Sequence, residues 1–166
     1  MGSEMCIRDR DLPDNAIVGT SSTRRSCQIH AARPDCDIQP LRGNVNTRLA
    51  KLDAGEYDAI ILASAGLKRL GFDQRITSYL DTEVSLPAIG QGAIGIECRQ
   101  NDACTEALLT PLHDVRTARA ITAERRISTA LSANCHLPIA AHATDSETQI
   151  NLRALVGSLD GKHLIR

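Results

Sequence analysis

Residues 59–63 read AIILA, and this continuous apolar run of strand length decides the fold. A run without polar alternation is typical of a parallel strand that is buried on both faces of its sheet. Two shorter strand-like stretches precede it, at residues 16–18 and 37–41, and a helix-forming stretch follows each of the three. This β-α-β-α-β-α order predicts a parallel sheet with right-handed crossovers, so the expected fold class is α/β.

Short polar side chains mark where the first two helices begin. Either Ser21 or Ser22 is the expected N-cap of a helix that runs to about Ala32. Either Asn44 or Asn46 is expected to cap the next helix. Because each helix follows a strand, both N-termini are expected at the carboxyl edge of the sheet, where the ligands of parallel sheets bind.

The pattern changes near residue 113, which indicates a second, smaller unit of the α+β class. Asp114 is the expected N-cap of a helix that runs to about Leu131. The segment that leads there, residues 86–96, is apolar and punctuated by glycine, so we expect it to be extended with bends. Beyond the helix, apolar residues alternate with polar or smaller ones, as in a half-buried antiparallel strand; they are Ile150, Leu152, Ala154 and Val156.

The composition excludes several classes of function. The formal net charge is −1 and 2% of residues are aromatic, which argues against a polyanion binder and against a platform that stacks nucleic-acid bases. No apolar run has membrane length, and the six cysteines lack the spacing of a zinc site. We therefore expect no nucleic-acid partner, no membrane partner and no metal, in a protein of the reducing cytoplasm.

Arginine is concentrated in two short runs, although the chain as a whole is not basic. Residues 19–25 read GTSSTRR and residues 41–48 read LRGNVNTR, so each run places arginines at the start of a helix. Arginine binds a carboxylate through two parallel N–H bonds, and a helix N-terminus offers further N–H groups to an anion. Because crowded arginines repel one another, the runs predict a small ligand with several acidic groups. Ordinary surface arginines are the alternative interpretation.

Cys135 lies in a loop between the end of the long helix and a proline. A cysteine with a packing role is the usual interpretation of such a position, and a functional thiol is the alternative. The neighbouring His136 is interpreted as an ordinary loop histidine. No aspartate or glutamate is singled out by its sequence context as a general acid or base.

Four motifs in this order resemble the porphobilinogen deaminase family, also called hydroxymethylbilane synthase. They are GTSSxRR from Gly19, LRGNVxTR from Leu41, LPAIGQGA from Leu86 and CHLPI from Cys135. The similarity runs from about residue 11 to the last residue, and four ordered motifs are far more specific than any one of them.

The resemblance implies a transferase of tetrapyrrole biosynthesis, the route to haem and chlorophyll. Such an enzyme condenses four porphobilinogen molecules head to tail, releases ammonia at each addition, and primes the chain on a dipyrromethane cofactor. The implied fold has two domains like those of type II periplasmic binding proteins, followed by a small α+β C-terminal domain. A monomer that takes porphobilinogen as its small-molecule substrate is expected.

The resemblance also assigns roles to residues. Cys135 matches the cysteine that holds the dipyrromethane cofactor through a thioether. The matches to the other cofactor contacts are Thr20, Ser21, Ser22, Arg24 and Arg25, and the matches to substrate contacts are Arg42, Asn44, Arg48 and Gln91. The family's catalytic aspartate lies in a segment that this sequence does not contain, so we expect little or no activity from the chain alone.

By the same resemblance the chain divides into four parts. Residues 1–10 lack periodicity and are interpreted as a foreign leader. Residues 11–91 are interpreted as the family's second domain, which binds substrate and cofactor, and residues 113–166 as a truncated C-terminal domain. Residues 92–112, between them, are interpreted as a crossover segment that belongs to a largely absent first domain. Two alternatives remain open: a small-anion-binding module of the periplasmic-binding-protein type without catalysis, and a structural fragment without a ligand. A covalent adduct on Cys135 would distinguish them, because only a deaminase requires one.

Overall fold

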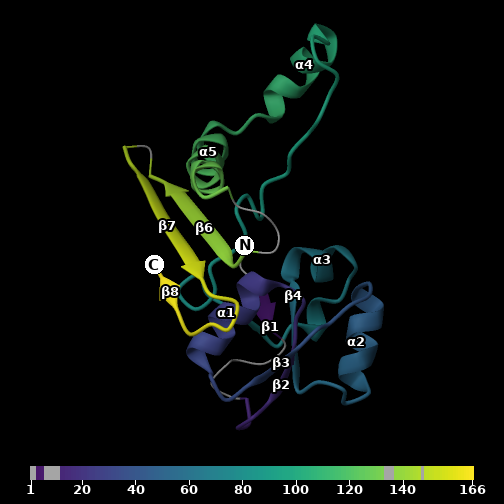
Figure 1. Ribbon diagram of the computed structural model, residues 1–166. Helices are drawn as coiled ribbons and strands as arrows, with labels where there is room; N and C mark the ends of the chain where they lie inside the picture. The colour runs from purple at the N-terminus through teal and green to yellow at the C-terminus, as the bar shows by residue number, and fades with distance from the viewer. Residues whose placement is uncertain (1–2, 6–11, 133–136, 147) are drawn as a thin grey trace.

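The computed structural model describes residues 3–5, 12–132, 137–146 and 148–166 (Figure 1). The first part of the chain forms, in order, β1 (Ser3–Met5), β2 (Ile17–Gly19), α1 (Thr23–Ala32), β3 (Asp37–Gln39), α2 (Val45–Asp53), β4 (Ala59–Ala63), α3 (Ser64–Arg69), η2 (Asp73–Arg75) and β5 (Ser78–Tyr79). The second part forms α4 (Ala103–Leu109), η3 (Thr110–Leu112), α5 (Val115–Ala130), β6 (Ile139–Asp145), β7 (Ile150–Gly157) and β8 (Leu164–Ile165). No helix within these described ranges is long and apolar enough to cross a membrane.

The strands of the first part form one sheet in the order β3-β2-β4-β1-β5. β2 pairs in parallel with both β3 and β4, which confirms the predicted parallel sheet and its α/β class. β1 is antiparallel to β4 and to β5. This strand comes from residues 1–10, which the sequence analysis assigns to a leader, and the lack of periodicity there is the reason that the sequence does not predict it.

Two apolar cores lie on opposite faces of this sheet, and β4 contributes to both. On one face Ala59 and Ile61 pack with Ile29 of α1. On the other face Ile60 and Leu62 pack with apolar side chains of α2 and α3. Residues 59–62 are therefore buried from both sides, as the continuous apolar run predicts.

The helices begin where the short polar side chains predict. Ser22 is the serine that caps α1, and its hydroxyl accepts the Arg25 N–H at 3.4 Å. Asn44 caps α2, with the Thr47 N–H donating to its Oδ1 at 2.9 Å. Asp114 caps α5 in the same way. Each cap satisfies an N–H group that the first helical turn would otherwise leave without a partner.

The second part of the chain is a three-stranded antiparallel sheet in the order β6-β7-β8, with α5 packed against it (Figure 1). This arrangement confirms the predicted α+β unit. The prediction for β7 is wrong in one respect, because Ile150, Leu152 and Val156 are exposed and Leu155 is buried. The opposite face of β7 packs against α1 and Leu86, a long-range contact that local alternation cannot reveal.

Residues 86–102 contain no helix or strand, which agrees with the extended segment predicted for residues 86–96. The chain then enters α4, which Figure 1 shows standing away from both sheets. The side chains agree with this view, since Ile94 is 83% exposed and Leu108 is 74% exposed. α4 is not among the helices predicted from the sequence, although Asp102 caps it by accepting the N–H of Thr105 at 3.1 Å.

Candidate functional site

The two arginine-bearing runs meet at the carboxyl edge of the parallel sheet. β2 and β3 are neighbouring parallel strands, so the turns that follow them leave the sheet at the same edge and lead into α1 and α2. The Ser21 hydroxyl donates to the Leu41 carbonyl oxygen at 2.9 Å and joins the two turns directly. The arginines of both runs are thus carried by adjacent helix N-termini, as the sequence predicts.

Arg24 is the buried arginine of this edge, with 7% of its surface exposed. Its Nη1 donates to the Leu86 carbonyl oxygen at 2.6 Å, and its Nη2 donates to Gln91 Oε1 at 3.4 Å. Burial, and then the neighbouring charge of Arg25, lowers the pKa of Arg24 to about 10. The guanidinium therefore stays charged at neutral pH, and two adjacent cations make this edge attractive to an anion.

Gln91 and the turn before it are held against α1. Gln91 Oε1 accepts the Ala88 N–H at 3.0 Å in addition to its bond from Arg24. Gln28 binds Leu86 twice, since its Oε1 accepts the Leu86 N–H at 2.7 Å and its Nε2 donates to the Leu86 carbonyl oxygen at 3.2 Å. Sequence reasoning named Gln91 but missed Gln28. The available signal was the i+4 spacing, which puts Gln28 and Arg24 on one helix face.

The other arginines of the edge are more accessible. Arg25 is half-buried, and its Nη1 donates to the Ile61 carbonyl oxygen of β4 at 3.2 Å. Arg48 Nε donates to the Gly43 carbonyl oxygen at 2.7 Å, and Arg42 is exposed. A guanidinium carries five N–H donors, so one bond to the backbone orients the Arg48 side chain and leaves donors for a carboxylate.

The small polar side chains of the two runs build the turns themselves. Thr20 is buried, and its Oγ1 accepts the Ser22 N–H at 3.3 Å. Ser22 and Asn44 serve as helix N-caps, and Ser21 links the two turns. These contacts place all four residues at the carboxyl edge, and their contacts to a ligand stay predictions.

The predicted cofactor cysteine, Cys135, and its neighbour His136 lie outside the described residues. The described chain resumes at Leu137 and enters β6, where Ala140 packs with Leu86 and with Cys27 of α1. β6 thus lies beside α1, the helix that carries Arg24.

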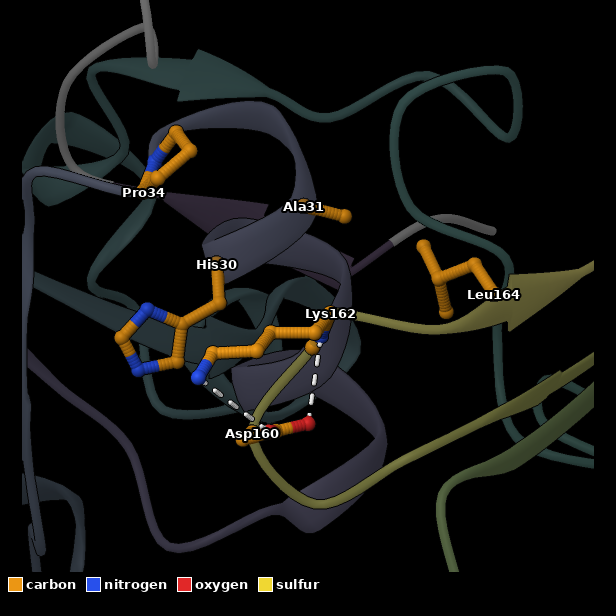
Figure 2. A pocket seen from close by; sticks show the side chains of 7 residues that line it. His30, Ala31, Pro34, Asp160, Lys162 and Leu164 are labelled. Atoms are coloured by element: carbon orange, nitrogen blue, oxygen red, sulfur yellow. Dashed lines mark hydrogen bonds and ion pairs between the residues drawn. The ribbon is translucent and has the colours of Figure 1, made fainter.

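A cavity of about 640 Å³ lies at the opposite end of α1, against the hairpin between β7 and β8 (Figure 2). Its polar lining includes His30, Asp160 and Lys162. Asp160 accepts the Ser158 hydroxyl at 2.5 Å, which lowers the pKa of the carboxyl, and it lies 3.9 Å from Lys162 Nζ. The charged groups of this cavity thus satisfy one another, and none of the predicted site residues that the structure describes lines it, so we place the candidate site at the arginine-bearing edge.

Two models of one protein family match the chain. Residues 4–107 match the family model described as porphobilinogen deaminase, dipyromethane cofactor binding domain. Residues 118–166 match the model described as porphobilinogen deaminase, C-terminal domain. The interval between the two matches falls where the chain passes from one sheet to the other. The matches cover most of the sequence, so the chain belongs to the porphobilinogen deaminase family and carries that family's dipyrromethane cofactor-binding domain.

Proposed function

We propose that this chain takes part in hydroxymethylbilane synthesis, the head-to-tail condensation of four porphobilinogen molecules with release of ammonia. One observation carries the proposal: both arginine-bearing turns converge on one sheet edge within the cofactor-binding domain. Each pyrrole unit of the product bears an acetate and a propionate, so the growing chain is a polycarboxylate. Guanidinium groups and helix N-termini at one edge have the chemistry to hold such a chain.

The described residues fit the dipyrromethane cofactor, which is itself a polycarboxylate. Arg24 is charged, buried and adjacent to Arg25, and both burial and that neighbour lower its pKa. A carboxylate placed beside the pair would offset the repulsion between them. Arg42, in the turn before α2, and Arg48, on α2, add further N–H donors to this edge.

The proposal divides the edge between cofactor and substrate. In the proposed arrangement the cofactor is held by Arg24 and Arg25 together with the hydroxyl and N–H groups of residues 20–22. Porphobilinogen and the growing chain are held by Arg42, Arg48, Asn44 and Gln91. When bound, the cofactor supplies the primer to which pyrrole units are added, and the arginines orient its carboxylates.

Cys135 is proposed as the covalent anchor of the cofactor, through a thioether at Sγ. In this role the cysteine reacts once, during attachment, and is not regenerated in each cycle. The described chain resumes at Leu137 and enters β6, whose Ala140 shares an apolar cluster with Leu86 and with Cys27 of α1, the helix that also carries Arg24.

We assign no aspartate of this sequence the part of the catalytic acid, and we propose that the chain alone has little or no turnover. Purified chain that converts porphobilinogen into hydroxymethylbilane would contradict this part of the proposal.

The proposal is tested by intact-mass measurement after incubation with preformed linear tetrapyrrole, with Cys135→Ala as the control. We expect a covalent adduct on the wild-type chain and none on the variant. An equal adduct on both chains would place the attachment elsewhere. Reversible binding of tetrapyrrole without any adduct would favour the alternative, a small-anion-binding module of the periplasmic-binding-protein type.

A further inference from the structure

Glu124 of α5 is a buried carboxylate, with 3% of its surface exposed, and both of its oxygens are used. Oε1 accepts the N–H of Ala143 in β6 at 2.8 Å. Oε2 accepts the N–H of Gly90 at 2.6 Å. His142 faces the same group, with its Nδ1 at 3.6 Å from Oε1. One side chain thus connects the edge strand of the C-terminal sheet to the glycine turn that precedes the crossover segment.

The glycine turn, together with Leu86 just before it, holds Arg24 from outside α1. Gly90 has φ +73°, a conformation that favours glycine, and the Gln91 N–H donates to the Ala88 carbonyl oxygen at 2.9 Å to close the turn. Gln91 Oε1 then accepts from Arg24 Nη2. The contacts therefore run without a break from Glu124 to Gly90, from Gly90 along the chain to Gln91, and from Gln91 to Arg24.

We propose that Glu124 is a positioning residue for the anion-binding edge: through Gly90 and Gln91 it fixes the guanidinium of Arg24. The inference rests on the proposed function of that edge as a carboxylate site. The C-terminal unit carries no arginine of the two runs. Through Glu124 it nevertheless affects how the first unit binds its ligand.

A role confined to packing does not account for the choice of a carboxylate. An apolar side chain would fill a buried position without the cost of removing a charge from water. A glutamine has one carbonyl oxygen, so it can keep one of the two N–H bonds and must present an N–H group to the other donor. The Glu124 carboxylate accepts from Ala143 and from Gly90 through separate oxygens, and Gly90 is the end that leads to Arg24.

The test compares Glu124→Gln with Glu83→Gln in the full chain. Glu83 is a matched control, because its carboxylate binds Arg153 of β7 and so also joins the two units, but among the described residues it makes no hydrogen bond or ion pair with the glycine turn. The first readout is the Nε–Hε signal of Arg24 in nitrogen-15 NMR spectra, assigned with Arg24→Lys. We expect Glu124→Gln to move this signal and Glu83→Gln to leave it in place.

The second readout is the affinity for tricarballylate, a small tricarboxylate, by calorimetry. We expect binding to weaken roughly tenfold in Glu124→Gln, because Arg24 is then less well positioned for a carboxylate, and less than twofold in Glu83→Gln. An unchanged Arg24 signal in Glu124→Gln, or an equal change in Glu83→Gln, would overturn the inference.

The two proposals fail separately. If the wild-type chain binds no tricarboxylate and forms no tetrapyrrole adduct, the proposed function fails, while the Arg24 signal still tests the positioning role. If Glu124→Gln does not fold, Glu124→Asp replaces it, because aspartate keeps the charge and withdraws it by one methylene group. A shifted Arg24 signal in that folded variant supports the inference, and a signal identical to that of the wild type overturns it.

Discussion

Arg33 and Asp35 fasten the chain that precedes β2 to the end of α1. Arg33 Nε and Nη2 bind the two carboxylate oxygens of Asp35 at 2.7 and 2.6 Å. The same guanidinium donates to the carbonyl oxygens of Leu12 and Pro13, and the Asn15 N–H donates to Asp35. The hydrogen bonds that the Asp35 carboxylate accepts from Arg33 are the main reason why its pKa lies well below the usual range.

This ion pair predicts an acid-sensitive contribution to stability. The folded-state pKa of Asp35 lies below the unfolded value of about 3.9, so the stabilisation is fully present above that value and is lost as the pH falls toward the folded pKa. We expect the urea midpoint of Asp35→Asn to lie below that of the wild type at about pH 7 and to approach it at about pH 3. Asp73→Asn, at an exposed position, is the control. A difference that stays constant with pH would contradict this origin.

At the scale of an element, Asn44 both caps α2 and stands at the proposed substrate site. Asn44→Ala removes the cap and should lower the free energy of unfolding by about 1 kcal/mol. Asn44→Asp keeps an oxygen that accepts the Thr47 N–H, so its stability should stay within about 0.5 kcal/mol of the wild type. The added negative charge should nevertheless weaken tricarballylate binding roughly three- to tenfold. Urea unfolding and calorimetry separate the two effects, and unchanged affinity in the aspartate variant would remove Asn44 from the ligand site.

The hairpin between β7 and β8 packs on α1 through a glycine. A Cβ on Gly161 would lie 2.5 Å from His30 Cβ and 2.8 Å from the Cys27 carbonyl oxygen, at φ +67°. Gly71 has φ +73° with open space around it, so the variant Gly71→Ala measures the cost of backbone strain without any steric clash. We expect Gly71→Ala to cost about 1–2 kcal/mol of unfolding free energy and Gly161→Ala roughly 2–5 kcal/mol, because overpacking adds to the strain. If urea unfolding shows the same loss of unfolding free energy for both variants, the contact between Gly161 and α1 has room for a Cβ.

Features that depend on neighbours in the sequence could be predicted, and features that depend on distant contacts could not. The cap at Asp114 needs only the N–H groups of the next helical turn, so the presence of an aspartate at this position was enough to predict it. Leu155 is buried because its face of β7 packs against α1 and Leu86. The alternation of apolar residues along β7 therefore predicted the wrong face of the strand as the buried one. Glu124 reads as an ordinary helix carboxylate, because its partner Gly90 lies 34 positions away.

The same limit applies to the site. Arg24 and its neighbours could be placed at a helix N-terminus from local sequence and from the family motifs. The hydrogen bond that joins Arg24 to Gln91 spans 67 positions, and only the folded chain brings the two motifs together.

At the scale of the whole molecule, one apolar cluster joins the two units. Cys27 of α1 and Leu86 pack with Ala140 and Leu155 of the C-terminal sheet. Leu155→Ala should cost about 2–5 kcal/mol of unfolding free energy, because Leu155 is 1% exposed. Leu152→Ala, on the exposed face of the same strand, should cost less than about 1 kcal/mol.

The cluster also predicts how the molecule unfolds. We expect the wild-type chain to unfold in one transition and Leu155→Ala to separate the two units into two transitions, observed by amide signals from α1 and from β7 during urea titration. Coincident transitions in the variant would show that the contact does not couple the units.

The exposed segment of residues 94–101 determines what a break in the chain would do. Residues 94–101 are exposed throughout, whereas the units on either side are held together by the apolar cluster and by the bonds of Glu124 and Glu83. None of these contacts passes through residues 94–101. We expect two polypeptides cut at this segment to stay assembled, so that Glu124 on the C-terminal piece still binds the Gly90 N–H of the piece that carries the arginines.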